Sequence, residues 1–129
     1  MPFVRIDLVE GRTLEQIHTI ADAVQECMEE VFAAPPRDRY QVVTEHKPGR
    51  IILEDTGLGL ERTDGVVVIS VLQQGRSAEQ KQALYAALAE RLELKAGVRP
   101  EDLMVNVSEN TRADWSFGMG RAQFLTGEL

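Results

Sequence analysis

The sequence predicts a two-layer α+β fold, in which two tandem β-α-β units form a four-stranded mixed sheet with two helices on one face. Three observations lead to this prediction. A segment recurs at a fixed spacing, a short apolar stretch precedes a helix in each copy, and a second strand-like stretch follows each helix. We expect the 129 residues to form a single domain, with one unit at 1–64 and the other at 65–129.

The repeat has an offset of 64 residues and contains no gaps. The segment 11–16, Gly-Arg-Thr-Leu-Glu-Gln, recurs at 75–80 as Gly-Arg-Ser-Ala-Glu-Gln. The same offset carries Pro36 and Asp38 onto Pro100 and Asp102. Separate segments that share one offset indicate that the chain holds two copies of one structural unit.

Apolar and β-branched residues predict two strands in each unit. The first strands are expected at Phe3–Val9 and Val66–Leu72, and the second strands near Tyr40–Glu45 and Leu103–Ser108. A strand, helix, strand order at this spacing implies a right-handed crossover between parallel strands. With both helices on one face, the other face of the sheet is left bare. We expect this face to be apolar and to be covered by symmetric self-association.

A helix is expected between the two strands of each unit. Thr13 with Gln16, and Ser77 with Gln80, match the capping box, in which hydroxyl and amide groups satisfy the first groups of a helix reciprocally. Apolar residues recur at helical spacing after each box, so one face of each helix is expected to pack on the sheet. These residues are Ile17, Ile20, Ala21, Val24, Met28 and Val31 in the first helix, and Leu84, Ala87, Leu88 and Leu92 in the second.

Two stretches lie outside the repeat, and we expect such stretches to carry specificity loops. Residues 49–65 contain a hairpin-like stretch, Ile51–Leu53, followed by Gly57-Leu58-Gly59. The two glycines resemble a phosphate-binding loop only superficially, because no helix start follows them. Residues 111–129 contain Trp115 and Phe117 within a glycine-bearing segment.

Composition excludes several classes of function. A formal net charge of −7 argues against a nucleic-acid partner, which needs a basic face. No apolar run is long enough to span a membrane, and no secretory signal pattern is present, so we expect a cytoplasmic protein. The single Cys27 cannot form an internal disulfide and is expected to fill core space. His18 and His46 lack metal-ligand spacing, so no metal is expected.

The sequence also resembles a known family along nearly its whole length. The resemblance begins with Met1-Pro2 and continues through Asp38–Gln41, Leu53–Gly59 and Ala113–Gly118. On these motifs the chain is similar to the tautomerase superfamily, and within it to the malonate semialdehyde decarboxylases. The resemblance implies a tautomerase-like fold, a homotrimer, and chemistry at an amino-terminal proline without a cofactor or metal.

The resemblance implies roles for particular residues. Pro2 is the proline whose secondary amine becomes available once Met1 is removed, and Asp38 is the aspartate that orients Pro2 or activates water. Arg76 binds the substrate carboxylate. The family has a second arginine two positions before it, where this chain has Gln74. We expect Gln74 to bind substrate, with Trp115 and Phe117 as an apolar wall.

Purely structural roles are the alternatives for three of these residues. Arg76 precedes a helix cap as Arg12 does, Asp38 occupies a turn as Asp102 does, and Trp115 fits a core or a subunit contact equally well.

These residues support decarboxylation of malonate semialdehyde, or a close 3-oxo acid, to an aldehyde and CO2, with promiscuous hydratase activity. A cationic Pro2 would polarise the carbonyl as a general acid, whereas a neutral Pro2 would attack it to form an iminium ion. Because Gln74 removes a positive charge and Asp38 adds a negative one, we expect Pro2 to be cationic near neutral pH. A hydratase or keto–enol tautomerase acting on a small 2-oxo acid is the alternative, and a non-enzymatic trimeric binding module is the third. In the first two cases the partner is a small anionic oxo acid.

Overall fold

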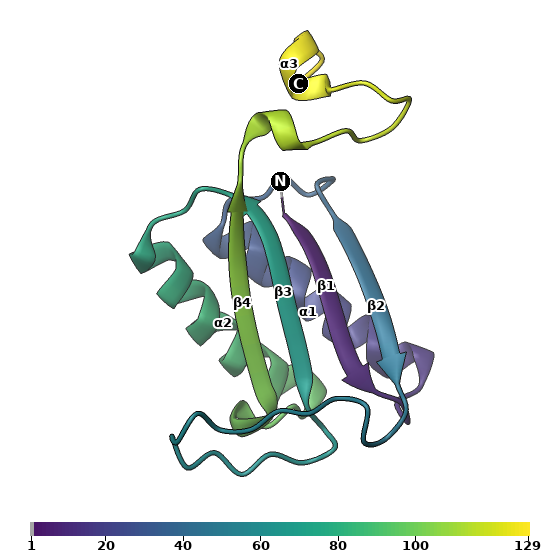
Figure 1. The fold of residues 1–129 in the computed structure, drawn as a ribbon, viewed down its shortest axis with the longest axis vertical. Coiled ribbons are helices and arrows are strands. Elements are labelled where there is room, and N and C mark those ends of the chain that lie inside the picture. Colours follow the sequence, from purple (N-terminus) through teal and green to yellow (C-terminus); the bar gives the residue numbers. More distant parts are fainter. Residues whose placement is uncertain (1) are drawn as a thin grey trace.

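The computed structural model describes residues 2–129 and confirms the predicted fold class, a four-stranded mixed sheet with two long helices on one face (Figure 1). The strands are β1 (Phe3–Val9), β2 (Tyr40–His46), β3 (Val67–Gln74) and β4 (Leu103–Asn110), and the long helices are α1 (Leu14–Val31) and α2 (Ala78–Ala96). Three short helices complete the chain: η1 (Pro100–Asp102), η2 (Arg112–Asp114) and α3 (Gln123–Thr126).

The two units are related by a local twofold axis perpendicular to the sheet. The strand order is β2-β1-β3-β4, with parallel pairs inside each unit and an antiparallel pair, β1 and β3, between them. Phe3 pairs with Leu72, and Leu8 pairs with Val67. The 64-residue offset relates Phe3 to Val67 and Leu8 to Leu72, so it turns the first pair into the second. A twofold axis between the two units requires this relation. The sequence repeat is therefore also a structural repeat.

Both helices begin and end in the same way. Both predicted capping boxes are present, with hydroxyl and amide groups bonded reciprocally to the main chain. Past the end of each helix, Ala33 (φ 55°) and Gly97 (φ 65°) occupy the left-handed region, again 64 residues apart. The following residues close the helix ends by hydrogen bonds from Ala34 N to Met28 O (3.2 Å) and from Val98 N to Leu92 O (3.1 Å).

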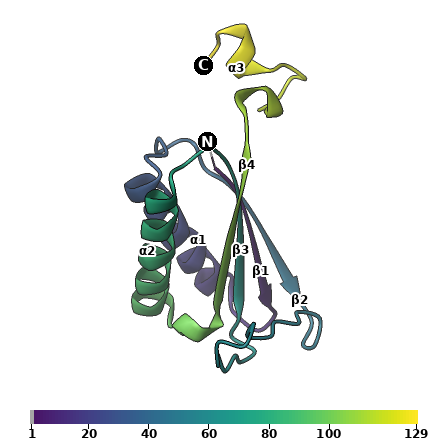
Figure 2. The same cartoon turned by 60° about the vertical axis from the view of Figure 1, so that its left-hand side comes forward.

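The core lies between the sheet and the two helices, as Figure 2 shows from the side. Alternate residues of the two central strands and the predicted helix stripes fill it, and Cys27 is fully buried among them. Burial raises the pKa of the Cys27 thiol to about 11, so the residue packs as an apolar group. Within residues 2–129, no helix is long and apolar enough to cross a membrane.

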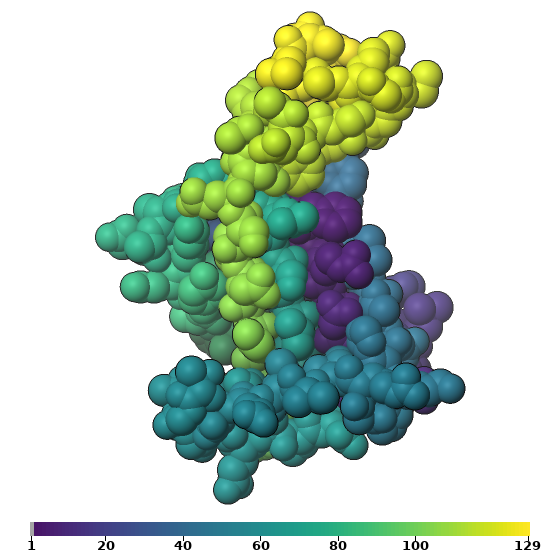
Figure 3. Space-filling view, viewed as in Figure 1, coloured from purple at the N-terminus to yellow at the C-terminus, as the bar shows by residue number. Residues whose placement is uncertain are grey.

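The bare face of the sheet is mixed, not apolar as the sequence pattern suggested. Val42, Leu72 and Met104 are each about 40% exposed on it, at 41%, 41% and 42%. Polar side chains alternate with them, and Asp7 on β1 contacts His46 on β2 with 2.7 Å between Oδ1 and Nε2. The face stays open between the long loop and the C-terminal segment (Figure 3). Alternation along each strand sends polar residues of these amphipathic strands to this side.

The loop between β2 and β3 contains no strand, so the hairpin expected at Ile51–Leu53 is wrong. Side-chain hydrogen bonds to main-chain groups hold the loop instead. The Asp55 carboxylate accepts from Gly57 N (3.0 Å) and Gly59 N (2.9 Å), and Arg62 donates to the carbonyls of Glu54 and Glu101, both at 3.0 Å. The extended apolar residues therefore lack a strand partner within the described chain.

Candidate active site

Strand register brings the predicted site residues to one end of the sheet. Phe3 lies opposite both Tyr40 and Leu72. Pro2, which directly precedes Phe3, is therefore level with the start of β2 and the end of β3. The C-terminal segment leaves β4 at this same end and extends past it (Figures 1 and 2).

Pro2 is buried at this end, immediately before β1. Met1, whose removal the chemistry of Pro2 requires, lies outside the described residues. A buried residue at the start of a central strand has a fixed position, because the strand is hydrogen-bonded on both sides. Such a position meets the geometric need of a catalytic group, which must be held in place relative to its substrate.

Arg76 lies just beyond β3 and is held by main-chain carbonyls. Its Nη1 atom donates to the carbonyls of Gln74 (3.2 Å) and Gly75 (3.0 Å), and its Nη2 atom donates to the carbonyl of Phe32 (3.0 Å). The guanidinium carbon also lies 5.4 Å from the centroid of the Phe32 ring. These contacts fix the cation at the Pro2 end of the sheet, beside the C-terminus of α1.

Asp38 differs from its repeat counterpart, Asp102, in the surroundings of its carboxylate. The two main-chain turns are equivalent, since each aspartate N–H donates to the carbonyl three residues earlier at 2.9 Å. Asp102 accepts hydrogen bonds from the N–H (2.7 Å) and the hydroxyl (2.6 Å) of Thr63. Asp38 Oδ2 is buried and has no hydrogen-bond partner among residues 2–129. Such an unpaired buried oxygen costs about 1–3 kcal/mol, so Asp38 Oδ2 is a candidate acceptor for a polar ligand at this end of the sheet.

Gln74 presents a second buried polar atom without a partner. It is the last residue of β3 and pairs in the sheet with Asn110 at the end of β4. Its Nε2 atom has no hydrogen-bond acceptor within the described chain. A buried amide donor and the buried oxygen of Asp38 thus both lie at the Pro2 end, so this end offers one donor and one acceptor to a polar ligand.

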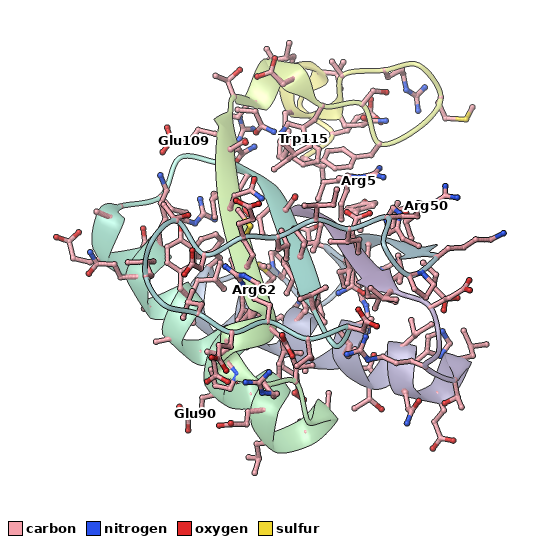
Figure 4. The ribbon with its side chains drawn as sticks, turned by 60° about the horizontal axis from the view of Figure 1, so that its bottom comes forward. Arg5, Arg50, Arg62, Glu90, Glu109 and Trp115 are labelled. Carbon is pink, nitrogen blue, oxygen red and sulfur yellow. The ribbon has the colours of Figure 1, made fainter. Side chains whose placement is uncertain are left out.

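An aromatic cluster links the C-terminal segment to this end of the sheet. The Phe117 ring lies 5.5 Å from Tyr40 on β2, 5.5 Å from Trp115 and 5.4 Å from Phe124. The Trp115 indole N–H donates to Asn110 Oδ1 at 2.9 Å. Trp115 and Phe117 are therefore half-buried beside the strand ends and well away from the main core. Figure 4 shows Trp115 in the C-terminal segment and Arg62 in the separate long loop.

Comparison with known proteins then decides the family. Residues 38–118 match one family model described as a tautomerase enzyme, and residues 2–61 match another with the same description. The chain belongs to the tautomerase family. Two probable tautomerases of Bacillus subtilis, YrdN and YusQ, are 49% and 36% identical to it. The first match covers all of both chains, and the second covers 97% of this chain and 99% of the relative.

Two crystal structures of malonate semialdehyde decarboxylases are also similar to this chain. They are 47% and 48% identical, with TM-scores of 0.95 and 0.94. Each match covers 98% of this chain, and 98% and 97% of the respective decarboxylase. A fused 4-OT protein, solved as a symmetric trimer, has a TM-score of 0.77 at 18% identity and shares the fold.

Sequence reasoning missed three residues that lie at this candidate site. Tyr40 and Asn110 position the aromatic cluster, and Phe32 lies against the Arg76 guanidinium. Tyr40 could have been found, because it begins a predicted strand two residues after Asp38. Phe32 and Asn110 gave no local signal, since their roles depend on contacts with distant segments.

Proposed function

We propose that this tautomerase is a decarboxylase that converts malonate semialdehyde, or a close 3-oxo acid, to an aldehyde and CO2. The observation that carries the proposal is the buried, unpaired Asp38 Oδ2 at the end of the sheet where Pro2 lies. Full-length similarity to two malonate semialdehyde decarboxylases supports the choice of substrate class. The lyase activity, its substrate and the residue roles below are parts of this proposal.

In the proposed reaction, the bond between the carboxylate carbon and C2 breaks. Its electron pair moves into the C2–C3 bond and onto the aldehyde oxygen, and CO2 leaves. The protonated Pro2 amine donates a hydrogen bond to that oxygen and stabilises the developing enolate. A proton from water then adds to C2, and the product of malonate semialdehyde is acetaldehyde. No electrons are gained or lost overall, so the reaction needs no redox partner.

The neighbouring residues would prepare the substrate and the amine for this step. The negative charge of Asp38 favours the protonated form of Pro2, because opposite charges stabilise each other in a partly buried site. Arg76 would attract the substrate carboxylate, and Gln74 Nε2 would donate to one of its oxygens. The wall formed by Trp115 and Phe117 would exclude water, which strengthens each of these interactions.

A hydratase or keto–enol tautomerase acting on a small 2-oxo acid is the second candidate. A neutral amide at Gln74, where the decarboxylase family has a cation, favours it because a single arginine binds a carboxylate less firmly. The relatives named as probable tautomerases point the same way.

We also propose that the protein is a homotrimer. Val42, Leu72 and Met104 expose apolar surface on the bare face of the sheet, and such surface favours self-association. Sedimentation should give a particle of three times the chain mass of 14.4 kDa. A monomer at micromolar concentration would contradict the trimer.

The decisive experiment compares three substrates with the native protein and the Pro2→Ala variant, after intact-mass measurement has established removal of Met1. The substrates are malonate semialdehyde, an alkynyl 2-oxo acid and phenylpyruvate. We expect CO2 release from the first, and a loss of about 10²–10⁴-fold in Pro2→Ala, the usual contribution of an acid–base group. Pro48→Ala, in an exposed turn, is the matched control and should keep full activity.

Each other outcome selects a different function. Turnover of the 2-oxo acids without CO2 release would replace the decarboxylase with the second candidate. Absence of turnover for all three substrates would favour a non-enzymatic binding module. Reductive trapping of a substrate adduct on Pro2 would replace carbonyl polarisation with an iminium mechanism.

A further inference from the structure

A cavity lies between the two helices at the end of the sheet away from Pro2. Its volume is about 200 Å³. The first turns of α1 and the last turn of α2 form it, so it is remote from the start of β1. Its lining residues are Arg12, Gln16, Thr19, Ile20, Lys95 and Ala96.

The internal repeat explains why this cavity exists. The 64-residue offset relates Arg12 to Arg76 and Ala96 to Phe32, and the matching helix ends described above support this alignment. In one unit the Phe32 ring lies 5.4 Å from the Arg76 guanidinium carbon. In the other unit the equivalent position holds only the methyl group of Ala96. The cavity beside Arg12 therefore corresponds to the place of an aromatic ring.

We propose that this cavity binds a small aromatic carboxylate, with its ring against Arg12 and Ala96. A cavity of about 150 Å³ is known to accommodate one benzene ring, so about 200 Å³ accommodates a ring with a small substituent. Ile20 and Ala96 supply apolar contact. The Arg12 guanidinium supplies the cation, and the ligand ring takes the place that Phe32 has beside Arg76.

The charges of the lining favour an anion over a neutral ring. The lining contains two cations, Arg12 and Lys95, and no carboxylate. Arg12 is held in place by a hydrogen bond from Nη2 to the Gly65 carbonyl at 2.9 Å. Lys95 Nζ contacts both oxygens of Glu26, at 2.7 and 2.8 Å, and Lys95 is partly exposed. An ammonium group has three N–H donors, so Lys95 can contact Glu26 and a carboxylate at the rim of the cavity at the same time.

Methyl NMR of the full-length protein tests this proposal, with benzoate and its neutral analogue benzyl alcohol as probes. We expect both to shift the methyl signals of Ile20 and Ala96, with benzoate binding at least threefold more tightly. The indole N–H of Trp115 reports on the Pro2 end and should not move. Lys95→Gln should remove the preference for benzoate and leave the affinity for benzyl alcohol unchanged.

Ala96→Phe should abolish binding of both probes, because it places in the cavity the ring that the first unit has. Ala86→Phe adds the same ring at an exposed position of α2 and is the matched control. If Ala96→Phe does not fold, Ala96→Leu fills much of the same space and should weaken both probes at least tenfold. Benzoate binding that survives these substitutions, absence of binding to the native protein, or shifts only at Trp115 would each overturn the proposal. None of these readouts depends on the reaction proposed for Pro2.

Discussion

Asp38 and Asp102 offer a comparison within one chain, because they occupy equivalent turns with different carboxylate environments. Asp102 has two hydrogen bonds from Thr63, whereas Asp38 Oδ2 has no partner among residues 2–129. In Asp102→Asn, the amide oxygen can accept from Thr63 N, but the amide nitrogen can only donate to the Thr63 hydroxyl, so that hydroxyl loses its acceptor and both hydrogen bonds lose the carboxylate charge. We expect the free energy of unfolding to fall by about 2–4 kcal/mol. In Asp38→Asn, Oδ2 has no hydrogen bond to lose among residues 2–129, and we expect a change within about 1 kcal/mol.

Thermal unfolding measures this difference. An unfolding entropy of about 2.1 cal/mol/K per residue gives about 0.27 kcal/mol/K for this chain, so a loss of 3 kcal/mol lowers the Tm by about 11 °C. The protein concentration must be kept equal, because association would make the Tm depend on it. Activity should show the opposite pattern, with a loss of about 10²-fold or more in Asp38→Asn and little change in Asp102→Asn. Equal destabilisation by both substitutions would refute the reasoning and assign Asp38 to the turn.

Three further predictions follow from individual side chains. Gln74→Arg should lower the KM for malonate semialdehyde about tenfold, and an unchanged KM would contradict its contact with the carboxylate. Hydrogen bonds from Gly57 N and Gly59 N lower the pKa of Asp55. The turn is therefore most stable above the unfolded-state pKa of about 3.9, and it weakens as the pH falls through the lower pKa of the folded state. The amide signals of both glycines should titrate with a midpoint below 3.8, whereas a higher midpoint would exclude this turn. Because burial raises the pKa of Cys27 to about 11, iodoacetamide should alkylate it at pH 8 only after denaturation, as mass spectrometry would show.

Local sequence patterns predicted most of the secondary structure and the repeat. The capping boxes require residues only three positions apart, and the helix stripes require residues three or four apart. The predicted site residues lie at the same end of the sheet, because the two β-α-β units place the start of β1 and the ends of β3 and β4 at one edge. The pattern failed at Ile51–Leu53, where an apolar stretch has no strand partner within the described chain.

The sequence by itself determined that two equivalent units exist, that Pro2 and Asp38 precede the strands of the first unit, and that Arg76 follows the first strand of the second unit. It could not distinguish Asp38 from Asp102, since each follows a proline in the same local turn. Only the tertiary structure decided this, because the partner of Asp102 is Thr63, 39 residues away. The tertiary structure likewise decided that Phe32 covers Arg76 while a cavity lies beside Arg12. Local hydrogen bonds form the same elements in both units, but contacts between distant segments make the two ends of the sheet chemically different.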